Sequence, residues 1–103
     1  MTWENKVQLV KLGNERYHSD DSKALFYNFV LENMDSFDCQ AWDMFYNLVS
    51  LIPSEMEKDL DFWKQIYQKV KSIEKDVIQK FGFLGALRFE AIKLLCEEEL
   101  GVS

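Results

Sequence analysis

Residues 54–81 read SEMEKDLDFWKQIYQKVKSIEKDVIQKF, and this stretch decides the fold class. Large apolar side chains recur in it at steps of three and four residues, which places them along one side of an α-helix. The stripe comprises Met56, Leu60, Trp63, Ile66, Tyr67, Val70, Ile73, Val77 and Phe81. Ser54 and Glu57 have the spacing of a capping box, so the helix is expected to begin there. Unbroken, it would be about 40 Å long, whereas a domain of this size is about 33 Å across. We therefore expect a break near Ser72 or an overhanging end.

Helical periodicity continues on both sides of this stretch, interrupted by residues that cap helices. Thr2, the polar cluster at 18–22 and Asp35 are the expected N-caps, and Gly82 and Gly85 suit a C-cap and a turn. The further helices are expected at 3–17, at 21–33, from Asp35 to about Ile52, and at 84–99. No stretch alternates apolar and polar residues for long, and the Asn-Gly and Asp-Gly turns of hairpins are absent. The sequence therefore predicts an all-α fold, a single-domain bundle of about five helices spanning residues 1–103.

Two of these helices are apolar on more than one side, which indicates a central position or an interface. The helix at 21–33 is one of them, and the helix at 84–99 is the other. The latter has two apolar stripes, one of Leu84, Leu87, Ala91, Leu94 and Leu95 and one of Phe89, Ile92 and Cys96. In the first helix, Trp3, Val7 and Val10 share one face.

The charge balance restricts the partners of the chain. Among its 103 residues, 18 are acidic and 12 are basic, which gives a formal net charge of −6. Such an excess of carboxylates argues against nucleic-acid binding, which requires Lys and Arg patches. No signal peptide and no apolar run long enough to span a bilayer is visible, so we expect no membrane association. We expect a cytoplasmic protein in which Cys39 and Cys96 are reduced.

The residues that carry most catalytic and metal chemistry are scarce. His18 is the only histidine, and it lies in an expected loop beside acidic residues. No spacing typical of zinc, di-iron or calcium ligands occurs, and no motif for a nucleophile is present. We therefore expect no enzymatic activity, no metal and no cofactor.

The distribution of charge along the chain is its most unusual feature. From Tyr17 to Glu57 the sequence holds eight acids and one base, Lys23, together with Tyr and Trp side chains. One interpretation is local, with acids that cap helices and aromatics that fill the core. The other is that the acids form one negative face that attracts a basic protein surface. The expected contact residues are Asp20, Asp21, Glu32, Asp35, Asp38, Trp42, Asp43 and Tyr46.

In size, acidity, cytosolic character and helical build, the chain resembles the small immunity proteins of bacterial contact-dependent growth inhibition and bacteriocin systems. The resemblance implies that it binds a cognate toxin, a basic RNase or DNase domain, and neutralises it by occluding the active site. The alternative is a helical adaptor or a homodimeric interaction module, including a phage-encoded inhibitor that mimics nucleic acid. A homodimer of this second kind is expected to bury Phe89, Ile92 and Cys96.

Overall fold

The long central helix is α5, Leu60–Gly85, in a computed structural model that describes residues 1–50 and 59–102. Its predicted apolar stripe faces the core, where Trp63, Ile66, Val70 and Val77 are buried. The predicted start at residue 54 is wrong for this helix, because its N-cap is Asp59, whose backbone is not helical. The capping box at 54–57 lies outside the described residues.

The break in α5 falls at a glycine and not at Ser72. Gly82 has φ 74° and ψ 173°, a conformation open almost only to glycine, and it separates the last turn from the rest of the helix. The regular part, 60–81, is about 33 Å long. That length fits a molecule with principal extents of 38 × 35 × 20 Å, so the late start and the kink together remove the expected overhang.

The first two helices begin at polar residues whose side chains cap them. α1 is Trp3–Glu15, and the Thr2 hydroxyl accepts the N–H of Asn5 at 3.2 Å. α2 is Asp20–Asn33, and the Ser19 hydroxyl accepts the N–H of Ser22 at 3.0 Å. The 3-10 helix η1, Met34–Ser36, then precedes α3, Cys39–Ser50, and α6 is Leu87–Leu100.

The predicted cap of α3 is wrong by three residues. Asp35 lies inside η1, and the N–H of Ala41 instead donates to Oδ1 of Asp38 at 2.9 Å. The short 3-10 turn displaces the start of α3 because Phe37, the residue that follows it, has an extended backbone.

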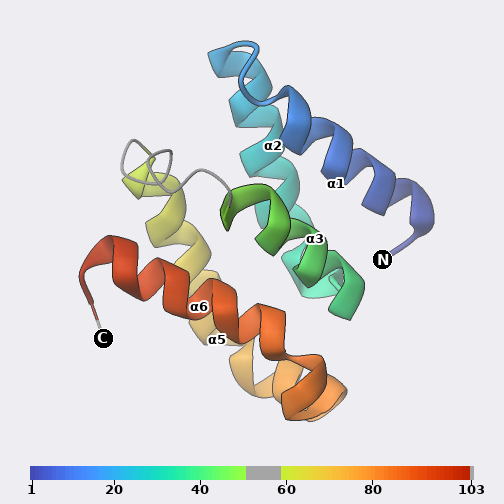
Figure 1. Ribbon diagram of the computed structural model, residues 1–103, viewed down its shortest axis with the longest axis vertical. Helices are drawn as coiled ribbons and strands as arrows, with labels where there is room; N and C mark the ends of the chain where they lie inside the picture. Colours follow the sequence, from blue (N-terminus) through green and yellow to red (C-terminus); the bar gives the residue numbers. More distant parts are fainter. Residues whose placement is uncertain (51–58, 103) are drawn as a thin grey trace.

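The described residues form five α-helices, one 3-10 helix and no strand, which confirms the all-α prediction. In Figure 1, α1, α3 and α6 lie side by side with α3 in the middle, and α2 and α5 lie behind them. The space between these layers is filled largely by aromatic rings. The largest fully buried side chains include Trp42, Phe26, Phe45 and Phe89. Polar groups buried in such a core need hydrogen-bond partners. The guanidinium of the buried Arg16 donates to the carbonyl oxygens of Gly13 and Leu48.

Several faces are oriented differently from the expectation. On α1 the buried side chain is Leu9, whereas Trp3 and Val7 are exposed. On α6 the stripe of Phe89, Ile92 and Cys96 is fully buried in the core of the single chain, so these residues cannot form a dimer interface. Both cysteines are free thiols, with Cys39 exposed and Cys96 buried.

Candidate functional site

The structure does not bring the eight predicted contact residues together on one surface. Three of them, Asp20, Asp21 and Glu32, are exposed on α2 and form no ion pair with the described residues. Asp35 lies in η1, directly after α2, and the ammonium of Lys69 is 2.9 Å from its carboxylate. The remaining four belong to α3 and its cap, which contact α1 and α6.

The two acids at the start of α3 are paired with bases from neighbouring helices. The Lys6 ammonium lies 2.6 Å from Asp38, and Nε of Arg88 lies 2.9 Å from Asp43. The same guanidinium lies 4.9 Å from the centre of the Tyr46 ring, at cation–π distance. These pairs join α3 to α1 and α6. Together with Asp35, three of the six acids that sequence reasoning assigned to a partner are therefore paired within the chain.

Trp42 is a core residue, and its prediction as a contact residue is wrong. It is 1 % exposed, and its ring centre lies 4.9 Å from those of Phe37 and Phe89 in edge-to-face geometry. Its position one turn after Asp38 places it on the inner side of α3, facing α6. A side chain so enclosed has no surface to offer a partner.

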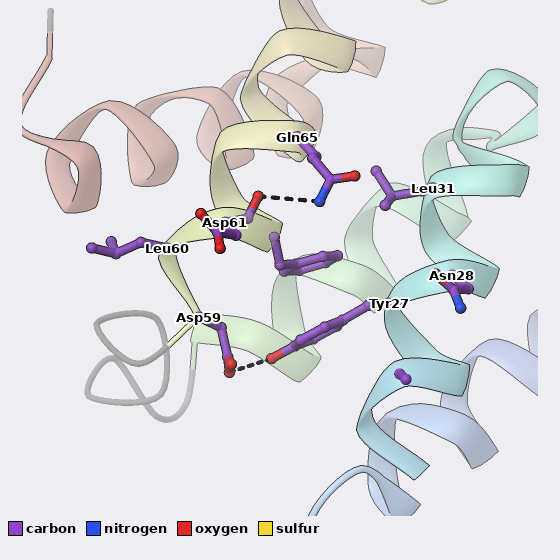
Figure 2. Close-up of a pocket in the computed structure, with 9 residues that line it drawn as sticks. Tyr27, Asn28, Leu31, Asp59, Leu60, Asp61 and Gln65 are labelled. Carbon is purple, nitrogen blue, oxygen red and sulfur yellow. Dashed lines mark hydrogen bonds between the residues drawn. The ribbon is translucent and has the colours of Figure 1, made fainter. Parts of the chain in front are cut away.

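A groove of about 440 Å³ lies between α2 and the beginning of α5 (Figure 2). The rings of Tyr27 and Phe62 stack across it, with centres 3.7 Å apart and planes inclined by 11°. The Tyr27 hydroxyl donates to Oδ2 of Asp59 at 2.5 Å, and the Lys23 ammonium lies 3.5 Å from the same oxygen. These contacts form one end of the groove, where the N-cap of α5 meets α2.

Small or polar side chains line the groove beside the stacked rings of Tyr27 and Phe62. Ala24 and Asn28 line it from α2, and Gln65 lines it from α5. A second hollow, which shares Leu31 and Gln65 with the first, extends it along α5 to Lys69 and Ser72. The groove therefore follows α5 from its N-cap to the helical turn that pairs with Asp35.

Four carboxylates of α2 and α5, one of which lines the groove, form no ion pair with any described residue, and we call them the acidic rim: Asp20, Asp21, Glu32 and Asp61. Asp20 and Asp21 lie one turn before the lining residue Ala24, and Glu32 lies one turn after Asn28. Asp61 lines the groove from the first turn of α5, where the helix dipole favours a negative charge. The acidic rim adds four negative charges near the α2–α5 groove.

A second pair of acids lies between α5 and α6, away from the acidic rim. A hydrogen bond from Lys93, at 2.8 Å, and one with Glu90 lower the pKa of Glu74. Burial, the hydrogen bond to Glu74 and the charge of Glu74 raise the pKa of Glu90. The arrangement is a charge-compensated contact between two helices. Within residues 1–50 and 59–102, no three His, Cys, Asp or Glu side chains lie close enough to hold a metal ion.

Comparison with protein-family models, curated proteins and solved structures finds no match for this chain. None of its described helices is long and apolar enough to cross a bilayer.

Sequence reasoning missed the groove and the residues that build it. Asp59 lay inside the predicted helix 54–81, so its role as a cap and as the acceptor for Tyr27 was hidden. Tyr27 and Phe62 come from two helices, α2 and α5, that are separated in the chain by the 26 residues 34–59. The available signal was the spacing of Asp20, Ala24, Asn28 and Leu31, which places small, polar and acidic side chains together on one side of α2.

Proposed function

We propose that the chain binds a basic protein surface through the groove between α2 and α5 and its acidic rim. The observation that carries this proposal is that these four carboxylates form no ion pair within the described part of the chain, whereas Asp38 and Asp43 do. Unpaired negative charge beside a groove favours a cationic partner and speeds its association. Exposed Leu25, one turn from Asp21, supplies apolar contact area beside the charges.

The specific form of this proposal is an immunity protein that neutralises a nuclease toxin in the cytoplasm. A nuclease holds the phosphates of its substrate with Lys and Arg side chains, and carboxylates of an inhibitor can take the place of those phosphates. The inhibitor then occludes the active site and needs no chemistry of its own. The acids of α2 lie near both ends of a helix about 20 Å long, which suits the width of an active-site cleft.

The test uses the protein encoded next to this chain in its genome, with its nuclease activity inactivated by mutation. A triple variant, D20N/D21N/E32Q, removes three negative charges from the rim. Its matched control, E4Q/E15Q/D76N, removes three charges elsewhere. We expect the rim variant to associate at least tenfold more slowly and to lose protection in a growth assay, and the control to stay within about threefold of the native chain.

Each other result contradicts part of the proposal. Equal losses of association rate and protection in both variants would show that only net charge matters. The groove would then not be the binding site. Unchanged binding by the rim variant would place the partner on another face. A neighbouring gene that encodes no basic nuclease would contradict the immunity function itself.

A further inference from the structure

The turn between α5 and α6 and the outer side of α6 expose a stripe of large apolar side chains, which we call the α6 outer face. Its members are Phe83, Leu84, Leu87, Ala91 and Leu94. Four of them are strongly exposed, with 77 % for Phe83, 84 % for Leu84, 60 % for Leu87 and 64 % for Leu94. The opposite side of the same helix, with Phe89, Ile92 and Cys96, is fully buried. The outer stripe is therefore not part of the core of the single chain.

The exposure of this stripe is built into the turn. The conformation of Gly82 directs the chain away from α5 just before Phe83 and Leu84. Gly85 then packs tightly, since a Cβ added there would lie 2.9 Å from Cβ of Phe81 and 3.3 Å from Sγ of Cys39. Both glycines fix the path of the turn, so the two apolar side chains between them are held in solvent.

The stripe is large enough for a small interface. Its four large side chains expose on the order of 500 Å² of mainly apolar surface, near the upper end of what a monomer usually shows in one patch. Two such faces in contact would bury about 1,000 Å² before their polar flanks are included, which approaches the size of specific interfaces.

We infer that a second copy of this chain packs on the α6 outer face, with the two α6 helices antiparallel and the twofold axis near Ala91. The charges on this face select both the occupant and the orientation. Glu98 lies in line with the stripe, one turn after Leu94, and Arg88 lies on its flank, one turn after Leu84. Antiparallel packing about Ala91 sets Arg88 of each copy level with Leu94 of the other, one helical turn from Glu98, and the long arginine side chain can span that turn.

A parallel arrangement would instead place Arg88 against Arg88 and Glu98 against Glu98, which is unfavourable. Both residues have capacity for the new contact. Arg88 uses Nε for Asp43 and retains its terminal N–H groups, and Glu98 forms no ion pair with a described residue. The small side chain of Ala91 lets the helices approach closely at the axis. The inference does not rest on the proposed function, because the α2–α5 groove and this face share no residue.

The first experiment measures the mass of the chain in solution over the micromolar to millimolar range by sedimentation equilibrium. We expect the native chain to reach twice its 12.2 kDa. L94E is expected to remain a monomer at every concentration. L25E, which changes a leucine of similar exposure on α2, is expected to dimerise like the native chain. Far-UV circular dichroism checks that both variants are folded. A monomeric native chain, or an L94E variant that still dimerises, would overturn the inference.

The second experiment tests the orientation. In a C39S background, A91C is expected to form a disulfide between copies under mild oxidation, because residues on a twofold axis lie next to their own symmetry mates. Cys96 does not interfere, since burial raises the pKa of its thiol to about 12. L25C in the same background is the control and is expected to remain uncross-linked. A dimer in which A91C fails to cross-link would contradict the antiparallel packing.

Discussion

The N–H of Ala41 donates a hydrogen bond to Oδ1 of Asp38 at 2.9 Å, while the ammonium of Lys6 lies 2.6 Å from the other carboxylate oxygen. One side chain therefore caps α3 and joins it to α1. Burial acts to raise the pKa of Asp38, but the hydrogen bonds from Lys6 and Ala41 and the charge of Lys6 together lower it below its usual value. The carboxylate is thus held in its charged form.

Replacement of Asp38 by alanine is expected to cost about 1 kcal/mol of the free energy of unfolding, the usual effect of losing an N-cap. Asp35 is the matched control, because it is acidic, ion-paired and three residues away, but lies in η1. D35A is expected to change stability by less than about 0.5 kcal/mol. Urea unfolding followed by circular dichroism measures both. Equal losses in the two variants would mean that the cap contributes nothing.

The pH dependence of D38N separates the ion pair from the cap, since Asn caps a helix about as well as Asp. Because folding lowers the pKa of Asp38, its extra stability is present above the unfolded pKa of about 3.9 and is lost as the pH falls through the lower folded value. The native chain is therefore expected to be slightly more stable than D38N at pH 6 and equal to it at pH 2. A difference that persists at pH 2 would contradict this assignment.

The fold class was predictable from the sequence because helical periodicity and capping residues are local signals. The apolar stripe of α5 and the caps Thr2 and Ser19 all follow from residues within a few positions of one another. The first residue of α3 was not predictable from the sequence, since Asp35 and Asp38 both fit an N-cap and the choice depends on the intervening 3-10 turn. The start of α5 at Leu60 was also hidden, because the apolar spacing continues upstream to Met56.

The site was less predictable because it depends on contacts between distant residues. Lys6 and Asp38 are 32 positions apart, and Asp43 and Arg88 are 45 apart, so no local pattern shows that these acids are neutralised within the chain. The same holds for Trp42. A Trp among acids has the composition of an interface anchor, and only the packing of α6 against α3 shows that it belongs to the core.

Trp42 supplies a second test. W42A removes a side chain that is 1 % exposed, so it is expected to cost about 3–5 kcal/mol of the free energy of unfolding. W42F keeps most of the ring volume, and no hydrogen bond is lost because the indole N–H has no partner among residues 1–50 and 59–102. It is therefore expected to cost much less than W42A. Chemical denaturation gives both values, and a W42A variant as stable as the native chain would contradict the position of Trp42 in the core.

Gly82 supplies a third test. No atom of the described residues lies within 4 Å of a Cβ added there, so an alanine would meet no steric obstacle from them. Its φ of 74° and ψ of 173° are nevertheless strained for any residue with a side chain. G82A is expected to cost about 1–3 kcal/mol, more than G101A, whose position has the milder left-handed helical conformation. If G82A unfolds at the same denaturant concentration as the native chain, the turn does not depend on this backbone geometry.

Glu90 supplies the last test. Its expected effect on the pH dependence of stability is opposite to that of Asp38. Burial and the neighbouring Glu74 raise the pKa of Glu90, and one of its carboxylate oxygens is buried without a hydrogen bond to any residue that the structure describes. The folded chain therefore holds its proton more tightly than the unfolded chain, and stability falls as the pH rises from about 4.3 through the raised folded value.

E90Q is neutral at every pH, and its amide can donate to Glu74. It is expected to be about 1 kcal/mol more stable than the native chain at pH 7 and equal to it at pH 3. D76N, at an exposed position on α5, is expected to change nothing. Thermal melts between pH 3 and pH 7 measure this difference. An E90Q variant that is less stable than the native chain at pH 7 would show that attraction to Lys93 outweighs the cost of burying the charge of Glu90.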